Sequence, residues 1–246
     1  MITVVIPTYN RQLFLEQAIL SVLNQTVPCD ELIVVDDGSM DDTEMLVNKL
    51  AGHADISIRY IYQENKGASA ARNQGIKIAV GDFICFLDSD DFFMPNKIAL
   101  QKQAIDESDF LVSHTCEQWL RRGKHLNQKL KHQPPDGYIF PECLPMCVVG
   151  MSTTMIHREL FNRYGMFDES LPCCEDYDFW LSLLEHNCGV HQIEEVLFYY
   201  RIKDTSRTQN LIQNRQDLLD SFHQLYLNHQ ALYDKHTSFI FHRLIE

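Results

Sequence analysis

Short apolar runs alternate with longer amphipathic segments along the first half of the chain. The runs are rich in β-branched residues, which is typical of buried strands in a parallel sheet. The longer segments repeat apolar residues at helical spacing, as helices do when one face packs on a sheet. The pattern predicts strands at 2–6, 32–35, 56–62 and 83–87, and helices at 13–23, from Asp41 or Asp42 to Leu50, at 67–79 and from Pro95 onward. Such alternation predicts a doubly wound, mostly parallel α/β sheet of the Rossmann-like type.

The alternation becomes irregular after about residue 108. Residues 117–149 hold a basic stretch and several prolines, which predict a long excursion or mobile loop. Further elements are expected as structure near 151–156, a helix at Glu175–Leu184, a strand at 196–201 and a helical tail from Leu211. The expected organisation is one domain over 1–205, with a nucleotide-binding half at 1–107, an acceptor half at 108–205 and a helical extension at 206–246.

Three polar clusters each follow directly after a predicted strand. They are Pro7–Asn10, Asp36–Asp37 and Asp88–Asp91. Parallel strands end at the same edge of a sheet, and ligands of doubly wound sheets bind beyond these carboxyl ends. The three clusters are therefore expected to meet in one site.

The cluster Asp88–Asp91 points to metal chemistry. Carboxylates this close repel one another, and burial would raise some of their pKa values. A hard divalent cation relieves the repulsion and prefers oxygen ligands. Two of Asp88, Asp90 and Asp91 can therefore hold Mg²⁺ or Mn²⁺, whose remaining positions take diphosphate oxygens and water. The alternative is a solvated turn, because such spacing arises often in an acidic chain.

The clusters after the first two strands suit a nucleotide base. One carboxylate of Asp36–Asp37 can accept a ring N–H of uracil, or it can serve only a turn and a helix cap. Tyr9 can pack its ring on the same base or be an ordinary half-buried aromatic. Lys66 or Arg72 can neutralise phosphate or contact the base. Neither a Walker loop nor a Gly-x-Gly-x-x-Gly turn is present, which argues against P-loop enzymes and dinucleotide dehydrogenases.

Glu175 and Asp176 open the predicted helix in the second half of the chain. Acidic residues favour the positive end of a helix dipole, so simple capping explains them. A carboxylate at this point can equally act as the general base for an acceptor hydroxyl. The residues alone leave both interpretations open.

The composition of the chain argues against several classes of partner and ligand. The formal net charge of −13 argues against a broad nucleic-acid-binding surface. The first strand starts at residue 2, and no apolar stretch approaches the roughly 20 residues that span a bilayer, so a cytoplasmic protein with reduced thiols is expected. Cys143, Cys147 and Cys173–Cys174 match no common zinc spacing, which favours buried or incidental thiols.

Five segments together resemble the family 2 glycosyltransferases with the GT-A fold. They are Val5–Asn10, Ile33–Ser39, Asn65–Gly67 with Ala71–Asn73, Phe86–Asp91 and Glu175–Asp176. They occur in the family's order and at similar spacing over roughly residues 1–205. Five segments in register are hard to explain by chance.

The resemblance implies an inverting, metal-dependent transfer of a sugar from a nucleoside diphosphate donor, usually UDP-linked. The acceptor would be a hydroxyl of a glycan or lipid-linked molecule in cell-surface polysaccharide synthesis, and contact with the inner face of the membrane stays open. The residues and the resemblance together give a nucleotide-binding set of Pro7, Thr8, Tyr9, Asp37, Lys66, Gly67, Arg72, Asp88 and Ser89, a metal set of Asp88, Asp90 and Asp91, and a catalytic set of Asp176 as base and Glu175 in support.

One departure from the family concerns the metal. Many relatives have a histidine two residues after the Tyr-Arg pair of the last strand, where this chain has Lys203. A protonated lysine cannot bind a metal, although it can touch a phosphate. His186 and His191 are possible substitutes. The alternatives to a transferase are a sugar-nucleotide pyrophosphorylase, which usually needs a glycine-rich loop after its first strand, and an inactive nucleotide-binding module.

Overall fold

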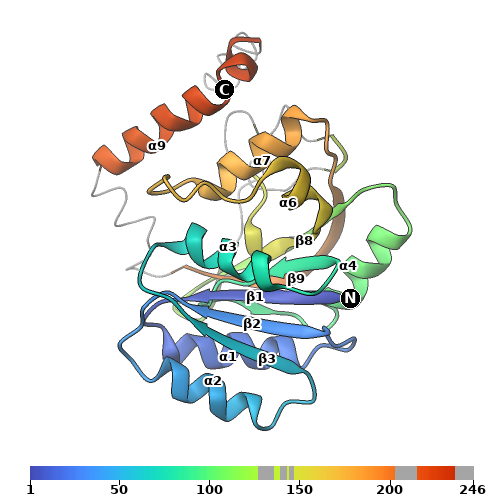
Figure 1. Cartoon of the computed structure of the whole chain (residues 1–246). Coiled ribbons are helices and arrows are strands. Elements are labelled where there is room, and N and C mark those ends of the chain that lie inside the picture. The colour runs from blue at the N-terminus through green and yellow to red at the C-terminus, as the bar shows by residue number, and fades with distance from the viewer. Residues whose placement is uncertain (127–135, 139–142, 144–146, 203–214, 236–246) are drawn as a thin grey trace.

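The computed structural model describes residues 1–126, 136–138, 143, 147–202 and 215–235 (Figure 1). The strands are β1 (Ile2–Thr8), β2 (Glu31–Asp36), β3 (Ser57–Tyr62), β4 (Phe83–Phe86), β5 (Phe92–Phe93), β6 (Val112–Arg121), β7 (Lys124–Leu126), β8 (Thr154–His157) and β9 (His191–Ile202). The helices are α1 (Gln12–Leu23), α2 (Thr43–Ala51), α3 (Ala68–Ile78), α4 (Lys97–Asp106), α6 (Glu159–Tyr164), α7 (Glu175–Glu185) and α9 (Arg215–Asn228), with a 3₁₀ turn at Met151–Thr153.

The strands in the described residues form one mixed sheet in the order β3-β2-β1-β4-β8-β6-β9-β5, with β7 paired to β6. Strands β3, β2, β1 and β4 are parallel, and β9 is parallel to β6. Strand β8 is antiparallel to both β4 and β6 and so joins the two parts. The expected α/β class with a mostly parallel sheet is confirmed. Because Thr8 pairs with Asp36 at the ends of β1 and β2, the polar residues that follow both strands emerge at the same edge.

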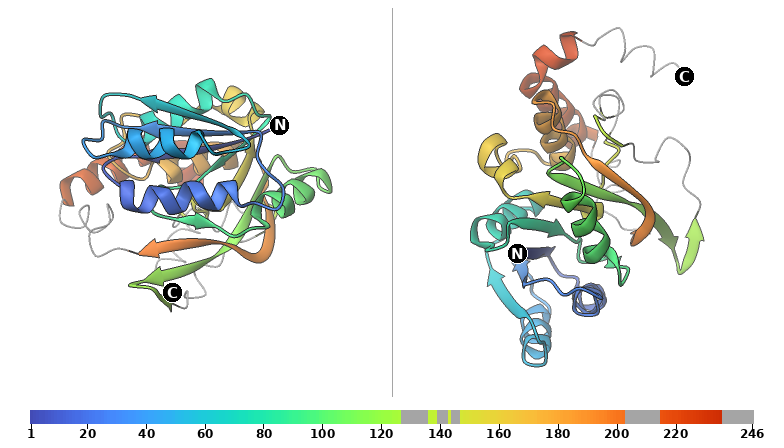
Figure 2. Two further views of the ribbon diagram at one scale, coloured as in Figure 1. Left: turned by 90° about the horizontal axis from the view of Figure 1, so that it is seen from below. Right: turned by 90° about the vertical axis from the view of Figure 1, so that its right-hand side faces the viewer.

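Helices cover both faces of the sheet (Figures 1 and 2). Alternate residues of a strand point to opposite faces. Val5 and Phe86 therefore belong to the core under α3 and α7, whereas Val4 and Val34 belong to the core under α1, α2 and α4. The uninterrupted apolar runs in the sequence reflect this burial on both faces.

The prediction of an excursion over 117–149 is wrong for residues 117–126. They complete β6 and form β7, which pairs with β6 through Trp119 and Leu126. Arg122 and Gly123 both have positive φ, 51° and 74°, which matches the two-residue turn that tight hairpins favour. The polar, basic sequence obscured this hairpin. Residues 127–135, 139–142 and 144–146 of the same segment lie outside the described residues.

Within the expected C-terminal extension at 206–246, the structure describes residues 215–235. They are helical over α9 and over a further segment at 230–235. Leu225 of α9 is fully buried against Tyr177 and Leu181 of α7. The division of the chain into two halves and a tail stays a prediction. Among the described helices, none combines the length and apolar character needed to cross a membrane.

Helix α3 lies unusually close to β1. A Cβ atom added to Gly75 would stand 2.4 Å from Cγ1 of Val5, whose side chain is fully buried. The absence of a side chain at Gly75 is therefore what allows this approach. It sets α3, and the functional residues on its first turn, against the carboxyl end of the sheet.

We expect Gly75→Ala to lower the free energy of unfolding by about 1–3 kcal/mol, because the stiff Val5 side chain cannot yield without strain. The gain in helix propensity, about 1 kcal/mol, offsets only part of that loss. Urea unfolding measures the change. Gly52→Ala is the matched control, since Gly52 has an ordinary φ of −67° and its nearest contacts would be at 3.7 Å. Equal stability of the two variants would contradict the close packing.

Candidate active site

A cavity of about 940 Å³ opens at the carboxyl ends of β1, β2 and β4. The N-terminal end of α7 forms its facing wall. It brings together all the residues predicted from the sequence except Lys66, namely Pro7, Thr8, Tyr9, Asp37, Gly67, Arg72, Asp88, Ser89, Asp90, Asp91, Glu175 and Asp176. The expected convergence of the three polar clusters is therefore present in the structure.

Asp37 holds the turn that leads into α3. Its Oδ1 accepts hydrogen bonds from Gln63 Nε2 at 2.7 Å and the Lys66 backbone N–H at 2.8 Å, and its Oδ2 accepts the Gly67 N–H at 2.8 Å. A carboxylate has about four acceptor positions, so Oδ2 can accept one more donor from the cavity. Lys66 contributes its amide here, while its side chain is exposed and does not line the cavity.

The turn after β1 is tied to the turn after β2. The Asn10 amide donates to Ser39 Oγ, and Asn10 Oδ1 accepts the Met40 N–H, both at 2.8 Å. Asn10 adopts a left-handed φ of 50°, which asparagine tolerates better than most residues. The preceding Tyr9 lines the cavity and is 45% exposed. Its ring is therefore available at the mouth of the site, beside Asp37.

Arg72 connects the two walls of the cavity. Its Nη2 donates to Asp88 Oδ1 and its Nη1 to Glu175 Oε1, both at 2.9 Å, and the side chain is only 7% exposed. Burial opposes the charge on the guanidinium, but Asp88, Glu175 and Asp176 raise its pKa above the ordinary value. The sequence predicted a nucleotide contact for Arg72 and gave no sign of this bridge.

The aspartates after β4 are held from several sides. Asp88 donates its N–H to Ser152 Oγ at 3.0 Å, Asp90 forms an ion pair with Arg11, and Asp91 Oδ1 accepts the Arg201 N–H at 2.7 Å. Burial, followed by the charges of Asp90 and Asp88, raises the pKa of Asp91 well above its ordinary value. The repulsion expected from the sequence is therefore present.

The donor set fits a hard divalent cation. Asp88 and Asp90 present carboxylate oxygens to the cavity, and the cluster has an excess of negative charge. In the described part of the chain, no three His, Cys, Asp or Glu side chains form a metal site by themselves. Sites for Mg²⁺ commonly use one or two carboxylates together with substrate phosphates and water. This arrangement suits such a shared site.

Glu175 and Asp176 differ in environment although they are adjacent. Glu175 is buried and paired with Arg72, whereas Asp176 is half-buried and faces the cavity. Burial and the charge of Glu175 raise the pKa of Asp176 from 3.8 to about 6, although Arg72 acts in the opposite direction. A carboxylate with this pKa can accept a proton near neutral pH.

Other cavity residues were not predicted as site residues. Arg11 follows the turn after β1 directly, so its position was a usable signal. Glu117 and Trp119 lie on β6, which was expected to be a loop. Tyr200 and Arg201 come from β9, and Leu218 comes from α9, for which the sequence gave no motif.

The proposed substitutes for a metal-binding histidine lie away from the cavity. His186 contacts the Ser182 carbonyl at the far end of α7, and His191 lies 3.7 Å from Asp136. Lys203 lies outside the described residues. All eight cysteines are free thiols, in line with the sequence interpretation.

Comparison with known proteins identifies the family. Residues 3–165 match the family model described as glycosyl transferase family 2. An uncharacterized glycosyltransferase of Rickettsia felis is 36% identical over 84% of this chain and 34% of its own length. The chain therefore spans about a third of that relative.

Two further proteins bear on the fold and the family. The Escherichia coli UDP-Glc:alpha-D-GlcNAc-diphosphoundecaprenol beta-1,3-glucosyltransferase WfgD is 30% identical over 90% of this chain and 86% of its own. The mannosyltransferase PcManGT from Pyrobaculum calidifontis, solved with GDP-Man and Mn²⁺, has a TM-score of 0.71 at 18% identity, covering 91% of this chain and 63% of that one. That structure supports the GT-A-like fold expected from the sequence. The match of the family model over more than half of the sequence shows that this chain belongs to glycosyl transferase family 2.

Proposed function

We propose that this chain transfers a hexosyl group from a nucleoside diphosphate sugar, with UDP as the nucleotide, to an acceptor hydroxyl with inversion. The observation that carries the proposal is the single cavity in which the cluster Asp88–Asp91 faces Glu175 and Asp176 across Arg72. Membership of the family supports a transferase over a pyrophosphorylase. A carboxylate at Asp176, in the same cavity as the aspartate cluster, supports an active enzyme over an inactive module.

The donor base would lie between the turns after β1 and β2. Tyr9 offers an exposed ring for stacking, and Asp37 Oδ2 retains an acceptor position for a ring N–H. Uracil presents such an N–H, and the name of the E. coli relative specifies a UDP-linked donor. Pro7, Thr8, Gly67 and Ser89 shape the surrounding wall.

The donor diphosphate would lie beside the aspartate cluster. Asp88 and Asp90, with Asp91 behind them, would hold Mn²⁺ or Mg²⁺, a role supported by the Mn²⁺ bound to the P. calidifontis structure. A cation bound there would stabilise the charge that develops on the departing diphosphate. Arg11 and Arg72 add positive charge on the same wall.

Asp176 would remove the proton from the acceptor hydroxyl as its oxygen attacks the anomeric carbon. Glu175 is held by Arg72 and supports the backbone on which Asp176 is placed. Attack from the face opposite the diphosphate inverts the configuration. The two walls of the cavity hold the partners together, and such positioning lowers the barrier substantially.

The acceptor would enter between β6 and α7. Trp119 offers a ring on which a sugar can stack, and Arg121, Arg122 and Lys124 are exposed at the tip of the same hairpin. With a sugar stacked on Trp119, these basic side chains could contact the diphosphate of a lipid-linked glycan, which is the acceptor type named for WfgD. Such an acceptor would bring the enzyme to the inner face of the membrane from a cytoplasmic location, in cell-surface polysaccharide synthesis.

We expect UDP to bind roughly tenfold or more tightly with Mn²⁺ or Mg²⁺ than in EDTA, a difference of about 1.4 kcal/mol. The reason is that a cation offsets the repulsion between the diphosphate and the aspartate cluster. Calorimetry measures the affinities. Asp90→Asn should reduce the metal dependence, and Asp109→Asn, at an exposed position outside the cavity, should not. Metal-independent binding would refute this part of the proposal.

We expect Asp176→Asn to lower kcat by about 100- to 10,000-fold while the affinity for UDP changes little. Because the base must be ionised, wild-type activity should fall as the pH drops through about 6, the pKa to which burial and Glu175 raise this carboxyl. Rate measurements over a range of pH and calorimetry with UDP separate the two effects.

The same substitution should not destabilise the fold. Folding raises the pKa of the Asp176 carboxyl, so its ionisation destabilises the folded state relative to the unfolded state. This destabilisation is absent below pH 3.8 and complete above about pH 6. Asp176→Asn should therefore unfold at the wild-type temperature or higher at pH 8. A parallel loss of UDP binding and of stability would mean that Asp176 is structural.

A further inference from the structure

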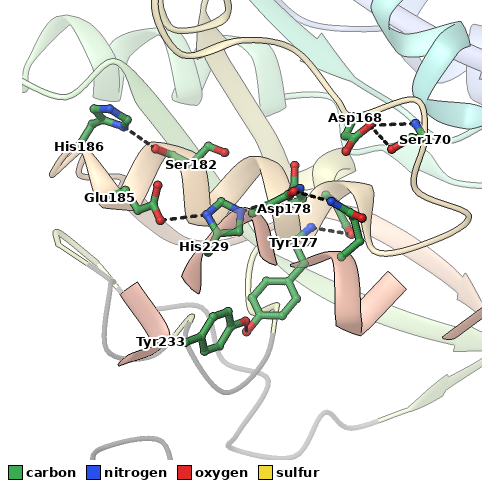
Figure 3. Close-up of polar contacts among 12 residues, drawn as sticks. Asp168, Ser170, Tyr177, Asp178, Ser182, Glu185, His186, His229 and Tyr233 are labelled. Atoms are coloured by element: carbon green, nitrogen blue, oxygen red, sulfur yellow. Dashed lines mark hydrogen bonds and ion pairs between the residues drawn. The ribbon is translucent and has the colours of Figure 1, made fainter. Parts of the chain in front are cut away.

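Helix α9 packs against α7, which carries the candidate base at its first turn. Figure 3 shows the contacts of His229, which follows α9, with Asp178 and Glu185 of α7. Leu225 of α9 is buried with Tyr177 and Leu181 of α7. Leu218, at the other end of α9, lines the cavity itself. The family model ends at residue 165, so this contact is made by a part of the chain beyond it.

His229, directly after α9, lies between two carboxylates of α7. Its Nε2 is 3.1 Å from Asp178 Oδ1 and its Nδ1 is 3.0 Å from Glu185 Oε1, and its side chain is 3% exposed. A neutral imidazole has only one N–H, whereas ionised carboxylates only accept hydrogen bonds. Both contacts are therefore satisfied when both ring nitrogens are protonated and the ring is positively charged.

The contacts of α9 bracket the segment that carries Glu175 and Asp176. On one side, Ser221 Oγ accepts a hydrogen bond from the Cys173 N–H at 3.3 Å. On the other side, His229 and Asn228 both contact Asp178 Oδ1, the latter at 2.9 Å. Between these points Cys174 adopts a left-handed φ of 63°, and α7 begins without a side-chain cap. The start of α7 is thus held by the Arg72–Glu175 pair, by the hydrogen bond from the Tyr177 N–H to Asp176 Oδ1 at 2.9 Å and by the contacts from α9.

We propose that His229 is a positioning residue for the transfer reaction. As a doubly protonated ring held by Asp178 and Glu185, it fixes the first turn of α7 and with it the carboxylate of Asp176. The role in transfer depends on the function proposed above. A displacement of about 1 Å at a reacting group can cost on the order of 100-fold in rate, so a contact two residues from the base is close enough to matter.

The charge state of His229 makes this positioning sensitive to pH. Burial disfavours the charged ring, but the hydrogen bonds to Asp178 and Glu185 raise the pKa of His229 above 6.5. The other titratable groups packed there are Tyr177 and Tyr233, whose hydroxyls are 3.4 Å apart and whose pKa values are raised mainly by burial. The thiol of Cys174 also has a raised pKa, of about 12, through burial and the adjacent Cys173.

The sign of the pH effect follows from the raised pKa of His229. The stabilisation by its two hydrogen bonds is complete below the ordinary value of 6.5 and is lost as the pH rises through the value in the folded protein. Both the hold on α7 and the transfer rate should then decline on the alkaline side.

The experiment compares His229→Gln and His229→Leu with the wild-type chain. Glutamine can donate hydrogen bonds but does not titrate, and leucine removes both contacts. His229→Leu should lower kcat, corrected for the folded fraction, by roughly 10- to 100-fold with less than a twofold change in the donor KM. His229→Gln should retain more activity and lose the alkaline decline while keeping the acid limb of Asp176. His223→Gln, at an exposed position on α9, is the matched control and should behave as wild type.

Amide hydrogen exchange over residues 173–178 provides a readout that needs no activity. Exchange there should be roughly tenfold or more faster in His229→Leu than in the wild type or His223→Gln, because a lost contact favours local opening. Unchanged exchange would overturn the proposal, whether or not transfer can be measured. Faster exchange with an unchanged kcat, or an alkaline decline that persists in His229→Gln, would also overturn it. Absence of any transfer by the wild type would instead refute the proposed function, and exchange would still decide whether His229 holds α7.

Discussion

Arg72 places a positive charge between two carboxylates that belong to opposite halves of the chain. Asp88 follows β4 in the first half of the chain, and Glu175 opens α7 in the second. Loss of one partner of a buried ion pair leaves an uncompensated charge, which commonly costs about 3–5 kcal/mol. The two walls of the cavity therefore cannot move apart without a large penalty. Close packing of Gly75 on Val5 sets the position of Arg72, so backbone packing and electrostatics converge on the same residue.

The cavity contains more acidic than basic side chains, and this excess explains several of its properties. Asp91 and Asp176 both have raised pKa values because burial and neighbouring carboxylates disfavour their charged forms. The same repulsion that favours a cation beside Asp88 and Asp90 thus favours proton acceptance by Asp176. The excess of negative charge therefore affects both walls of the cavity. Arg72 pairs with a carboxylate on each wall and so offsets the repulsion between them.

The sequence predicted that the polar clusters after β1, β2 and β4 meet on one wall of the cavity, because the information for this is local. Each cluster on that wall follows a strand, and parallel strands bring their ends together. The bridge from Arg72 to Glu175 spans 103 residues, and no periodicity reports such a contact. The hairpin of β6 and β7 was missed because its polar and basic residues resemble those of a loop. His229 was missed because a histidine in a helical tail carries no motif, and only the packing of α9 on α7 gives it carboxylate partners.

The end of the family model, at residue 165, separates two groups of cavity residues. The cavity wall from the turn after β1 to Asp91 lies within residues 3–165, whereas Asp176, β9 and α9 lie beyond them. A base must keep its position relative to the donor even when the acceptor differs. Arg72 is paired with Glu175, next to the proposed base, and His229 contacts Asp178 two residues after it. Leu218 of α9 and Trp119 of β6 line the same cavity, so it is bordered by residues from inside and from outside the range of the family model.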